Sequence, residues 1–149
     1  MLDDEIRKNV SRMPVIEFDD PAFVRPPKLS DATVAIVTTA GLRQQGDASW
    51  TPRDPNYRVF ESDAEDLRLG HLSPNFDRSG FVADINVAFP IDRLKEMAEE
   101  GLIGAVAPRH VSFMGAQDGG MGTIRRDTAP AVAKLLREDG VDVVLLTPV

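Results

Sequence analysis

The sequence contains no cysteine among its 149 residues. This absence excludes disulfides, thiolate metal ligands and a cysteine nucleophile within these residues. Long apolar runs are also missing, since no stretch approaches the roughly 18 to 20 residues that a membrane-spanning helix needs. The first ten residues, MLDDEIRKNV, lack the apolar core of a secretory signal. We therefore expect a cytoplasmic protein that has no membrane partner.

Basic charge is scarce as well. The chain has 17 Lys and Arg against 24 Asp and Glu, a net charge of -7. Nonspecific nucleic-acid binding depends on clustered basic residues that neutralise phosphates, and arginines such as Arg125 and Arg126 are too sparse to form a basic stripe. The composition argues against a nucleic-acid partner and favours a small substrate or a protein partner.

The first 30 residues predict an irregular N-terminal arm, because four prolines interrupt any regular element there. These prolines are Pro14, Pro21, Pro26 and Pro27. The apolar residues of the arm are Val15, Ile16, Phe18, Phe23 and Val24. They indicate that the arm packs on the domain surface or on a neighbouring subunit. Residues 31–149 are then expected to form one α/β domain.

A polar region separates the first strand of this domain from the rest. Residues 41–80 are rich in Pro, Asp and Gly, which predicts long loops with short elements. The aromatic residues Trp50, Tyr57 and Phe60 favour an ordered, packed loop. Residues 82–87 then predict a short strand or extended segment.

Strands and helices alternate along the chain. Apolar runs at 33–39, 102–107 and 141–147 predict strands buried on both faces. Segments 91–100 and 128–139 show the spacing of amphipathic helices, and each is followed by a glycine. The strand–helix order is typical of parallel sheets. We therefore predict an α/β, Rossmann-like three-layer fold with a parallel central sheet.

The last predicted strand is the most apolar and should lie centrally in the sheet. The sequence stops at Val149, just beyond the tip of this strand. In open α/β sheets ligands bind beyond the carboxyl ends of the strands. Two interpretations remain open, a natural edge strand or a chain truncated before its site residues. Continuous apolarity favours truncation, so we expect the fold to be incomplete at the C-terminus.

Two polar loops contain the histidines. His71 can act as a general acid or base with Asp77 as an orienting carboxylate, although a capped surface turn is an alternative. Arg109, His110 and Ser112 follow the predicted 102–107 strand, where site residues collect. Arg109 can hold a substrate carboxylate and His110 can transfer a proton. A purely structural histidine is the alternative for His110.

Asp84 and Asn86 alternate with apolar residues and so project to the same side of an extended segment. They can orient a substrate ammonium or carboxyl group, or they can cap the turn into the next helix. The glycines between 115 and 122 match neither phosphate-loop nor dinucleotide-binding spacing. The two histidines also lack a metal-ligand spacing. The residues themselves therefore predict no cofactor and no metal.

Three stretches together resemble the selenoprotein B family of glycine/betaine/sarcosine/D-proline reductases. They are Asp54-Pro-Asn-Tyr-Arg-Val59, the block from His71 to Phe89 that continues Pro-Ile-Asp-Arg-Leu, and Gly101-Leu-Ile-Gly with Arg109-His-Val-Ser-Phe-Met-Gly115. The similarity extends through Asp139 to Pro148. It spans roughly residues 30–149, and the ordered series is more specific than any single motif.

The resemblance implies a chemistry that this sequence cannot complete alone. In the family the Leu-Leu-Thr-Pro strand leads into a selenocysteine or cysteine, so the nucleophile is expected at or just after Val149. A selenocysteine codon taken as a stop, or a shortened chain, would explain its absence. The implied reaction is reductive cleavage of a C–N bond alpha to a carboxyl group of an amino-acid-like substrate. A pyruvoyl group on a partner subunit holds that substrate as an iminium while the selenolate displaces the nitrogen.

Under the reductase hypothesis the candidate residues chosen above surround the missing nucleophile. The expected catalytic residues are His71, Asp84, Asn86 and His110, and the expected substrate-binding residues are Arg109 and Ser112. A homo-oligomer or hetero-oligomer is expected. The alternative is a non-catalytic Rossmann-like binding or scaffold protein that lacks the redox residue.

Overall fold

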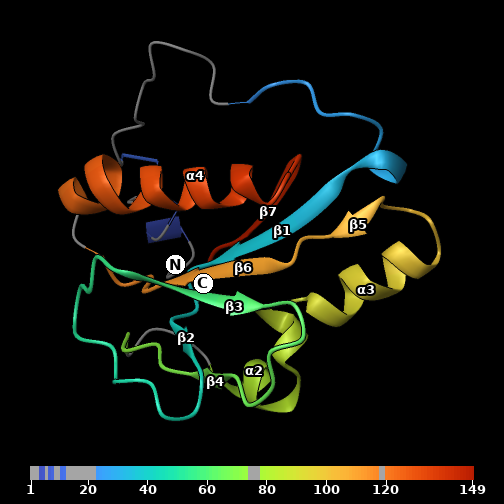
Figure 1. The fold of residues 1–149 in the computed structure, drawn as a ribbon. Helices are drawn as coiled ribbons and strands as arrows, with labels where there is room; N and C mark the ends of the chain where they lie inside the picture. Colours follow the sequence, from blue (N-terminus) through green and yellow to red (C-terminus); the bar gives the residue numbers. More distant parts are fainter. Residues whose placement is uncertain (1–3, 6, 9–10, 13–22, 74–77, 118–119) are drawn as a thin grey trace.

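The computed structural model describes residues 4–5, 7–8, 11–12, 23–73, 78–117 and 120–149. The described residues form an α/β domain around a mostly parallel sheet (Figure 1). In this described part, no helix is both long and apolar enough to cross a membrane.

Strand β1 (Thr33–Thr38) lies at the centre of the sheet. On one side it pairs in parallel with β5 (Ala105–Val106) and β6 (Arg109–Phe113), and on the other with β7 (Val143–Thr147). Strand β3 (Tyr57–Glu61) adds an antiparallel edge next to β6. The predicted parallel arrangement of three strands is therefore confirmed, with one antiparallel strand that makes the sheet mixed.

Helices lie on both faces of the sheet (Figure 1). One face is covered by α2 (Ser79–Ala83), the 3-10 turn η2 (Ile85–Val87) and α3 (Ile91–Glu99). The other is covered by α4 (Ala129–Glu138), which continues a π-helical turn, η3 (Ile124–Thr128). The helices predicted at 91–100 and 128–139 are confirmed.

Side chains of β1 alternate between two apolar clusters, as the two-residue period of a strand requires. The first cluster contains Val34, Ile36, Leu42, Phe60, Phe89, Ile91 and Leu94. The second contains Ala35, Val111, Phe113, Val132 and Leu136. Because both faces of β1 are buried, this strand holds the two layers of helices together.

The predicted strand 102–107 is wrong in its bounds. Leu102 donates its main-chain N–H to Met97 and completes the turn that ends α3, so the strand begins only at Ala105. Pro108 then divides β5 from β6, because proline has no N–H for the ladder. The strand resumes at Arg109 and continues to Phe113. Arg109, His110 and Ser112 therefore lie within a strand rather than in the loop that follows one.

The predicted extended segment 82–87 is also wrong, since these residues belong to α2 and η2. Region 41–80 includes β3 and a small antiparallel pair, β2 (Leu42–Arg43) with β4 (Arg68–Leu69). Trp50 is buried and donates its ring N–H to the carbonyl of Leu42 at 3.1 Å. In the described residues of this region, the prediction of an ordered, packed loop is confirmed.

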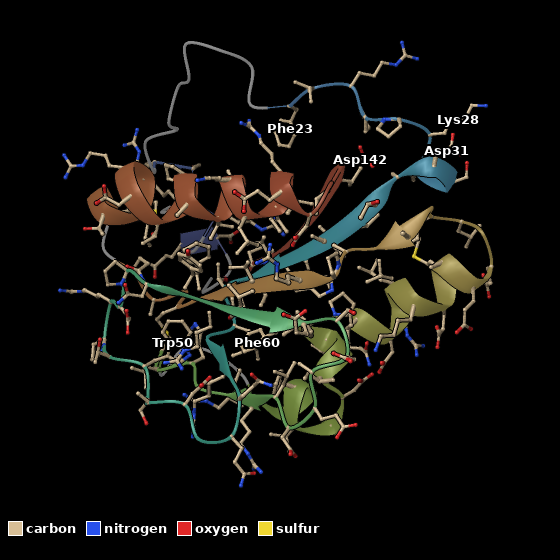
Figure 2. The ribbon with its side chains drawn as sticks, in the orientation of Figure 1. Phe23, Lys28, Asp31, Trp50, Phe60 and Asp142 are labelled. Carbon is tan, nitrogen blue, oxygen red and sulfur yellow. The ribbon has the colours of Figure 1, made fainter. Side chains whose placement is uncertain are left out.

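The N-terminal arm is only partly described. Phe23 and Val24 are 87% and 84% exposed, so these two residues do not pack on the domain surface, and the alternative, packing on a neighbouring subunit, stays a prediction. Figure 2 shows Phe23 outside the body formed by the sheet and helices. The other residues invoked for packing (Val15, Ile16 and Phe18) and the prolines Pro14 and Pro21 lie outside the described residues.

The predicted central position of the last strand is wrong. Strand β7 pairs with β1 alone among the described strands, and Val144, Leu145 and Leu146 are 39%, 38% and 61% exposed. The central place is taken by β1, whose two edges are both paired. Strand β7 is therefore more apolar than a partly exposed edge strand needs to be.

Candidate functional site

The carboxyl ends of β1, β6 and β7 meet at one edge of the sheet because these strands are parallel. Thr39 follows β1 and joins this edge to the end of β7. The main-chain N–H of Val149 donates to Thr39 Oγ1 at 2.9 Å, and that hydroxyl donates to the main-chain oxygen of Val149 at 3.3 Å. The main-chain N–H of Thr39 donates to the Thr147 carbonyl at 3.2 Å. These bonds fix Val149 beside Thr39.

His71 reaches the same edge from the loop after β4. The Gly70 N–H donates to the Gly41 carbonyl at 2.9 Å, which ties this loop to the chain leaving β1. Gly41 has a φ of +62°, and a Cβ there would lie 2.8 Å from Met114 Cε and 3.3 Å from His71 Cα. Only glycine suits this conformation and this contact. Gly41 therefore allows His71 to pack against the end of β1.

The His71 ring, Thr39 and Val149 converge on Gly115, which follows the end of β6. A Cβ on Gly115 would stand 2.9 Å from His71 Nε2 and 2.8 Å from the main-chain oxygens of both Thr39 and Val149. The separation of His71 Nε2 from the Val149 oxygen therefore cannot exceed the sum of the 2.9 Å and 2.8 Å distances. Glycine at 115 is required because any side chain would fill the point where the three groups meet.

His71 presents an N–H donor at this point. The ring is buried, and the Ser73 main-chain N–H donates to Nδ1 at 3.1 Å, so the proton of the neutral ring is on Nε2. Burial, and then the positive charge of Arg78, lower the pKa of His71 from its usual 6.5. At neutral pH the ring is uncharged, with Nε2–H toward Gly115. Asp77, the predicted orienting carboxylate, lies outside the described residues.

His110 lies in the core near the start of β6, away from Gly115. It is fully buried, its Nδ1 accepts the Ile36 main-chain N–H at 2.9 Å, and its ring meets Phe89 edge-on at 5.6 Å. The break between β5 and β6 at Pro108 interrupts the main-chain hydrogen bonds to β1. The imidazole of His110 therefore accepts the Ile36 N–H in place of a main-chain carbonyl. Burial, with a smaller contribution from Lys95, lowers the pKa of His110 to about 4. This arrangement matches the structural alternative for His110.

Arg109 is the first residue of β6 and so lies at the amino-terminal edge of the sheet, at the opposite end of the strand from Gly115. Its Nε and Nη2 donate to the two carboxylate oxygens of Asp139 at 2.8 and 2.6 Å. The hydrogen bond with Asp139 raises the pKa of Arg109 and lowers that of Asp139. At this edge the Asp142 carboxylate also accepts the Thr33 N–H at 2.9 Å. The charge of Arg109 is thus matched by Asp139.

Ser112 is buried and directed into the domain. Its hydroxyl accepts the Leu42 main-chain N–H at 2.8 Å and donates to the Phe113 carbonyl at 3.3 Å. These contacts hold β2 against the end of β6. A side chain with no exposed surface cannot touch a substrate in this conformation.

Asp84 and Asn86 cap a turn, which was the alternative left open for them. The Asp84 carboxylate accepts the main-chain and side-chain N–H groups of Asn86, both at 2.9 Å, and these bonds lower its pKa. Asn86 Oδ1 accepts the Asp92 N–H at 3.1 Å in the first turn of α3. The turn ends at Ala88, whose carbonyl accepts the Thr147 hydroxyl at 2.9 Å. The pair thereby positions a turn that contacts the end of β7.

Of the six predicted site residues, the structure brings only His71 to the Val149 end with its ring directed there. The sequence analysis gave neither Thr39 nor Gly115 a place in this site. Both follow parallel strands, which is a usable signal, but the true end of β6 was not recognisable. Among the residues that the structure describes, no cluster of three His, Asp or Glu side chains suits a metal ion.

The fold and this edge define the class of the protein as an α/β domain with a histidine at the carboxyl edge of a mostly parallel sheet. Comparison with known proteins makes the assignment specific. The chain belongs to the glycine/sarcosine/betaine reductase selenoprotein B family, whose family model matches residues 7–149. The resemblance seen in the sequence is therefore confirmed. No solved structure matches the chain.

Several curated relatives are subunits of reductase complexes. The chain is 39% identical over 123 residues to D-proline reductase subunit gamma of Acetoanaerobium sticklandii, covering 80% of this chain and 50% of the relative. It is 29% identical over 145 residues to sarcosine reductase complex component B subunit beta of Peptoclostridium acidaminophilum, covering 88% and 32%. It is 29% identical over 150 residues to glycine reductase complex component B subunit gamma of Carboxydothermus hydrogenoformans, also covering 88% and 32%. The chain thus spans half the length of the first relative and about a third of the others.

Proposed function

We propose that this chain is part of a reductase subunit that cleaves a C–N bond alpha to the carboxylate of a small amino-acid-like substrate. The substrate class is that of glycine, betaine, sarcosine and D-proline. The observation that carries the proposal is the convergence of His71 Nε2, Thr39 and Val149 over Gly115 at the carboxyl edge. Membership of the selenoprotein B family and the names of the relatives support it.

His71 is proposed to assist the departure of the nitrogen in this reaction. When the C–N bond breaks, nitrogen keeps the bonding electron pair, and a primary or secondary amine leaves readily only if it gains a proton. A neutral ring would become an imidazolate if it lost its Nε2 proton, so His71 donates a hydrogen bond from Nε2–H to the departing nitrogen, and water supplies the proton that the nitrogen gains. The two electrons that the reduction consumes come from a dithiol.

The nucleophile is proposed to be a selenocysteine or cysteine held next to Val149 by polypeptide beyond this chain, which itself has no thiol. Such a group supplies the anion that displaces nitrogen. His71 Nε2–H lies near the Val149 end and could donate a hydrogen bond to that anion. Thr39 fixes the main chain at that place through both of its bonds to Val149.

The proposal extends to partners and setting. A pyruvoyl-containing partner subunit would hold the amino group of the substrate, in a hetero-oligomer like the complexes that the relatives' names describe. Helices on both faces of a mostly parallel sheet support a Rossmann-like three-layer architecture for the complete domain. A cytoplasmic location would keep the dithiol donor reduced.

The test is a reconstituted reductase. The chain is joined to the part of Acetoanaerobium sticklandii D-proline reductase subunit gamma that the similarity does not cover, and combined with the partner subunits of that enzyme. Turnover with a dithiol is followed as ring opening of D-proline, or as release of ammonia, methylamine or trimethylamine from glycine, sarcosine or betaine. We expect turnover of at least one substrate by the assembly and none by the 149-residue chain alone.

The role of His71 is tested in the same assembly. His71→Ala should lower kcat/KM by roughly 100-fold or more for a substrate with a primary or secondary amine. Arg109→Met, which changes only the far edge, is the matched control and should retain activity. Equal activity of His71→Ala and the intact assembly would remove His71 from the mechanism. An inactive but correctly assembled complex would favour the scaffold alternative.

A further inference from the structure

Strand β7 ends the sheet with an unusually apolar edge. It pairs with β1 on one side, and Figure 1 shows it on the side of β1 away from β6. Alternate main-chain N–H and C=O groups of an edge strand point away from its neighbour and can bond another strand. From Val143 to Thr147 no charged residue, proline or bulge protects this edge, although protein edges usually carry such features.

Both faces of β7 also lack full cover. Its register with β1 places Val144 and Leu146 on the α4 side of the sheet and Leu145 on the α3 side. All three side chains are at least 38% exposed. The Thr147 hydroxyl at the end of β7 donates to the Ala88 carbonyl, and the neighbouring Val87 is 63% exposed. Apolar side chains on both faces of a strand are typical of an internal strand with a neighbour on each side.

We infer that the outer edge of β7 is the docking surface for a further apolar β-strand, supplied by the remaining part of the reductase subunit. The occupant follows from the relatives, in which the matched stretch is 50% or 32% of the whole subunit. A subunit of that length has more than the roughly 30 residues that one additional strand–helix unit needs. An added strand would pair the edge, and its connecting helix would cover Val144 and Leu146. This inference rests on the proposed function for the identity of the occupant.

The experiment measures association without measuring reductase activity. The 149-residue chain is co-expressed with the unmatched part of Acetoanaerobium sticklandii D-proline reductase subunit gamma as a separate polypeptide. Complex formation is followed by light scattering after size exclusion, and amide exchange is followed in residues 143–147. We expect a one-to-one complex in which the amides of β7 exchange at least ten-fold more slowly than in the chain alone.

Two lysine substitutions locate the contact. Leu146→Lys places a charge on the exposed face of β7 and should weaken the complex at least ten-fold. Leu102→Lys changes a leucine of comparable exposure, 52% against 61%, in the turn after α3 and should leave the complex intact. Circular dichroism of both variants establishes that they are folded. A complex that tolerates Leu146→Lys, or no complex with the folded chain, overturns the inference.

A second copy of the chain is the competing occupant. An antiparallel pair of β7 strands centred on Leu145 would bring the two copies of that residue together. Because the chain has no cysteine, Leu145→Cys would then form a disulfide dimer under mild oxidation. Val82→Cys, on α2, would not, although Val82 is more exposed than Leu145, 81% against 38%. Such a dimer overturns the inference, and its absence beside a one-to-one complex supports it. A complex that forms but lacks turnover leaves the docking surface in place and removes the proposed reaction.

Discussion

The two histidines of this chain lie in regions that share almost every local property except position. Each ring is buried, and each accepts a main-chain N–H at Nδ1, from Ser73 for His71 and from Ile36 for His110. Each has a pKa below the usual value, with burial as the main cause. They differ in their surroundings. Nε2 of His71 lies beside Gly115 and Val149, whereas the ring of His110 packs on Phe89.

The difference shows that burial and a lowered pKa do not distinguish the histidine proposed as catalytic from the one with a structural role. His110 supports the ladder where Pro108 interrupts it, and it lies near the beginning of a strand. His71 reaches the edge where three parallel strands end, and its Nε2 lies beside Gly115 and the main-chain oxygen of Val149. Position in the sheet therefore separates the two roles, and variants at each position can test this separation.

The largest effect on stability is expected from His110→Ala. The substitution leaves a cavity in the core and removes the acceptor of the Ile36 N–H, so we expect a loss of about 3 to 5 kcal/mol in the free energy of unfolding. His71→Ala should cost about 1 to 2 kcal/mol, since the ring lies at the edge of the sheet and mainly its bond from Ser73 is lost. Urea unfolding of both variants gives the comparison. Equal losses would contradict the division of roles.

The stability of the chain should fall in acid before its carboxylates are protonated. The pKa of His110 is about 4 when folded and near 6.5 when unfolded, so the unfolded chain binds the proton first as the pH falls. The stability that neutral His110 provides is complete above pH 6.5 and is lost between pH 6.5 and 4, by roughly 3 kcal/mol. The lowered pKa of His71 acts in the same direction.

Asp84 and Asp139 act in a different range. Their pKa values are lowered on folding, so their contribution is lost only as the pH falls below their usual value of 3.8. His110→Gln, which keeps an acceptor for Ile36 but does not titrate, should flatten the pH dependence between 6.5 and 4. NMR titration of the two rings gives a direct measurement, and a His110 pKa near 6.5 in the folded chain would refute this account.

Much of the fold was predictable because the spacing of apolar residues along the chain reflects which side chains are buried. The burial of β1 on both faces and the spacing of α3 and α4 follow from local sequence, and the glycines at 101 and 140 both have the positive φ of a helix end. Strand β3 was not predictable, because its antiparallel pairing with β6 joins residues about 50 positions apart. The bounds of β5 and β6 depend on Pro108 in a pairing that the sequence alone does not show.

The site was less predictable than the fold. His71 was recognised from its residue type and its polar loop, but Arg109 was assigned to the wrong edge because the strand was taken to end at residue 107. The sequence pattern of Asp84 and Asn86 is compatible with a turn cap as well as with a substrate site. Their hydrogen bonds in the structure are those of a cap. Gly115 has no functional side chain, so only the convergence of other groups on it reveals its place.

A smaller effect is expected from Gly115→Ala. The new Cβ would stand within 3.0 Å of His71 Nε2 and of two main-chain oxygens, so the chain after β6 must move. Overpacking of this kind costs about 1 to 3 kcal/mol. The NMR signals of the His71 ring should shift while those of His110 remain, since only His71 contacts the new methyl group. Ala116→Gly, one residue further, is the control and should leave both rings unchanged.

The smallest effect is expected from Arg109→Met, which removes the ion pair at the edge opposite His71. The Arg109 side chain is 32% exposed, so water screens the pair, and its loss should lower the free energy of unfolding by less than any variant above, despite the bidentate geometry. The loss should shrink at high salt, because screening already weakens the pair in the parent chain. The carboxyl group of Asp139 should return toward its usual pKa, since the bond from Arg109 is the main cause of its lowering. The ring signals and pKa of His71 should not change, because the charge lies at the other end of β6. A shift of the His71 pKa in Arg109→Met would show that the two edges are coupled, and the separation of a structural edge from a reactive one would then fail.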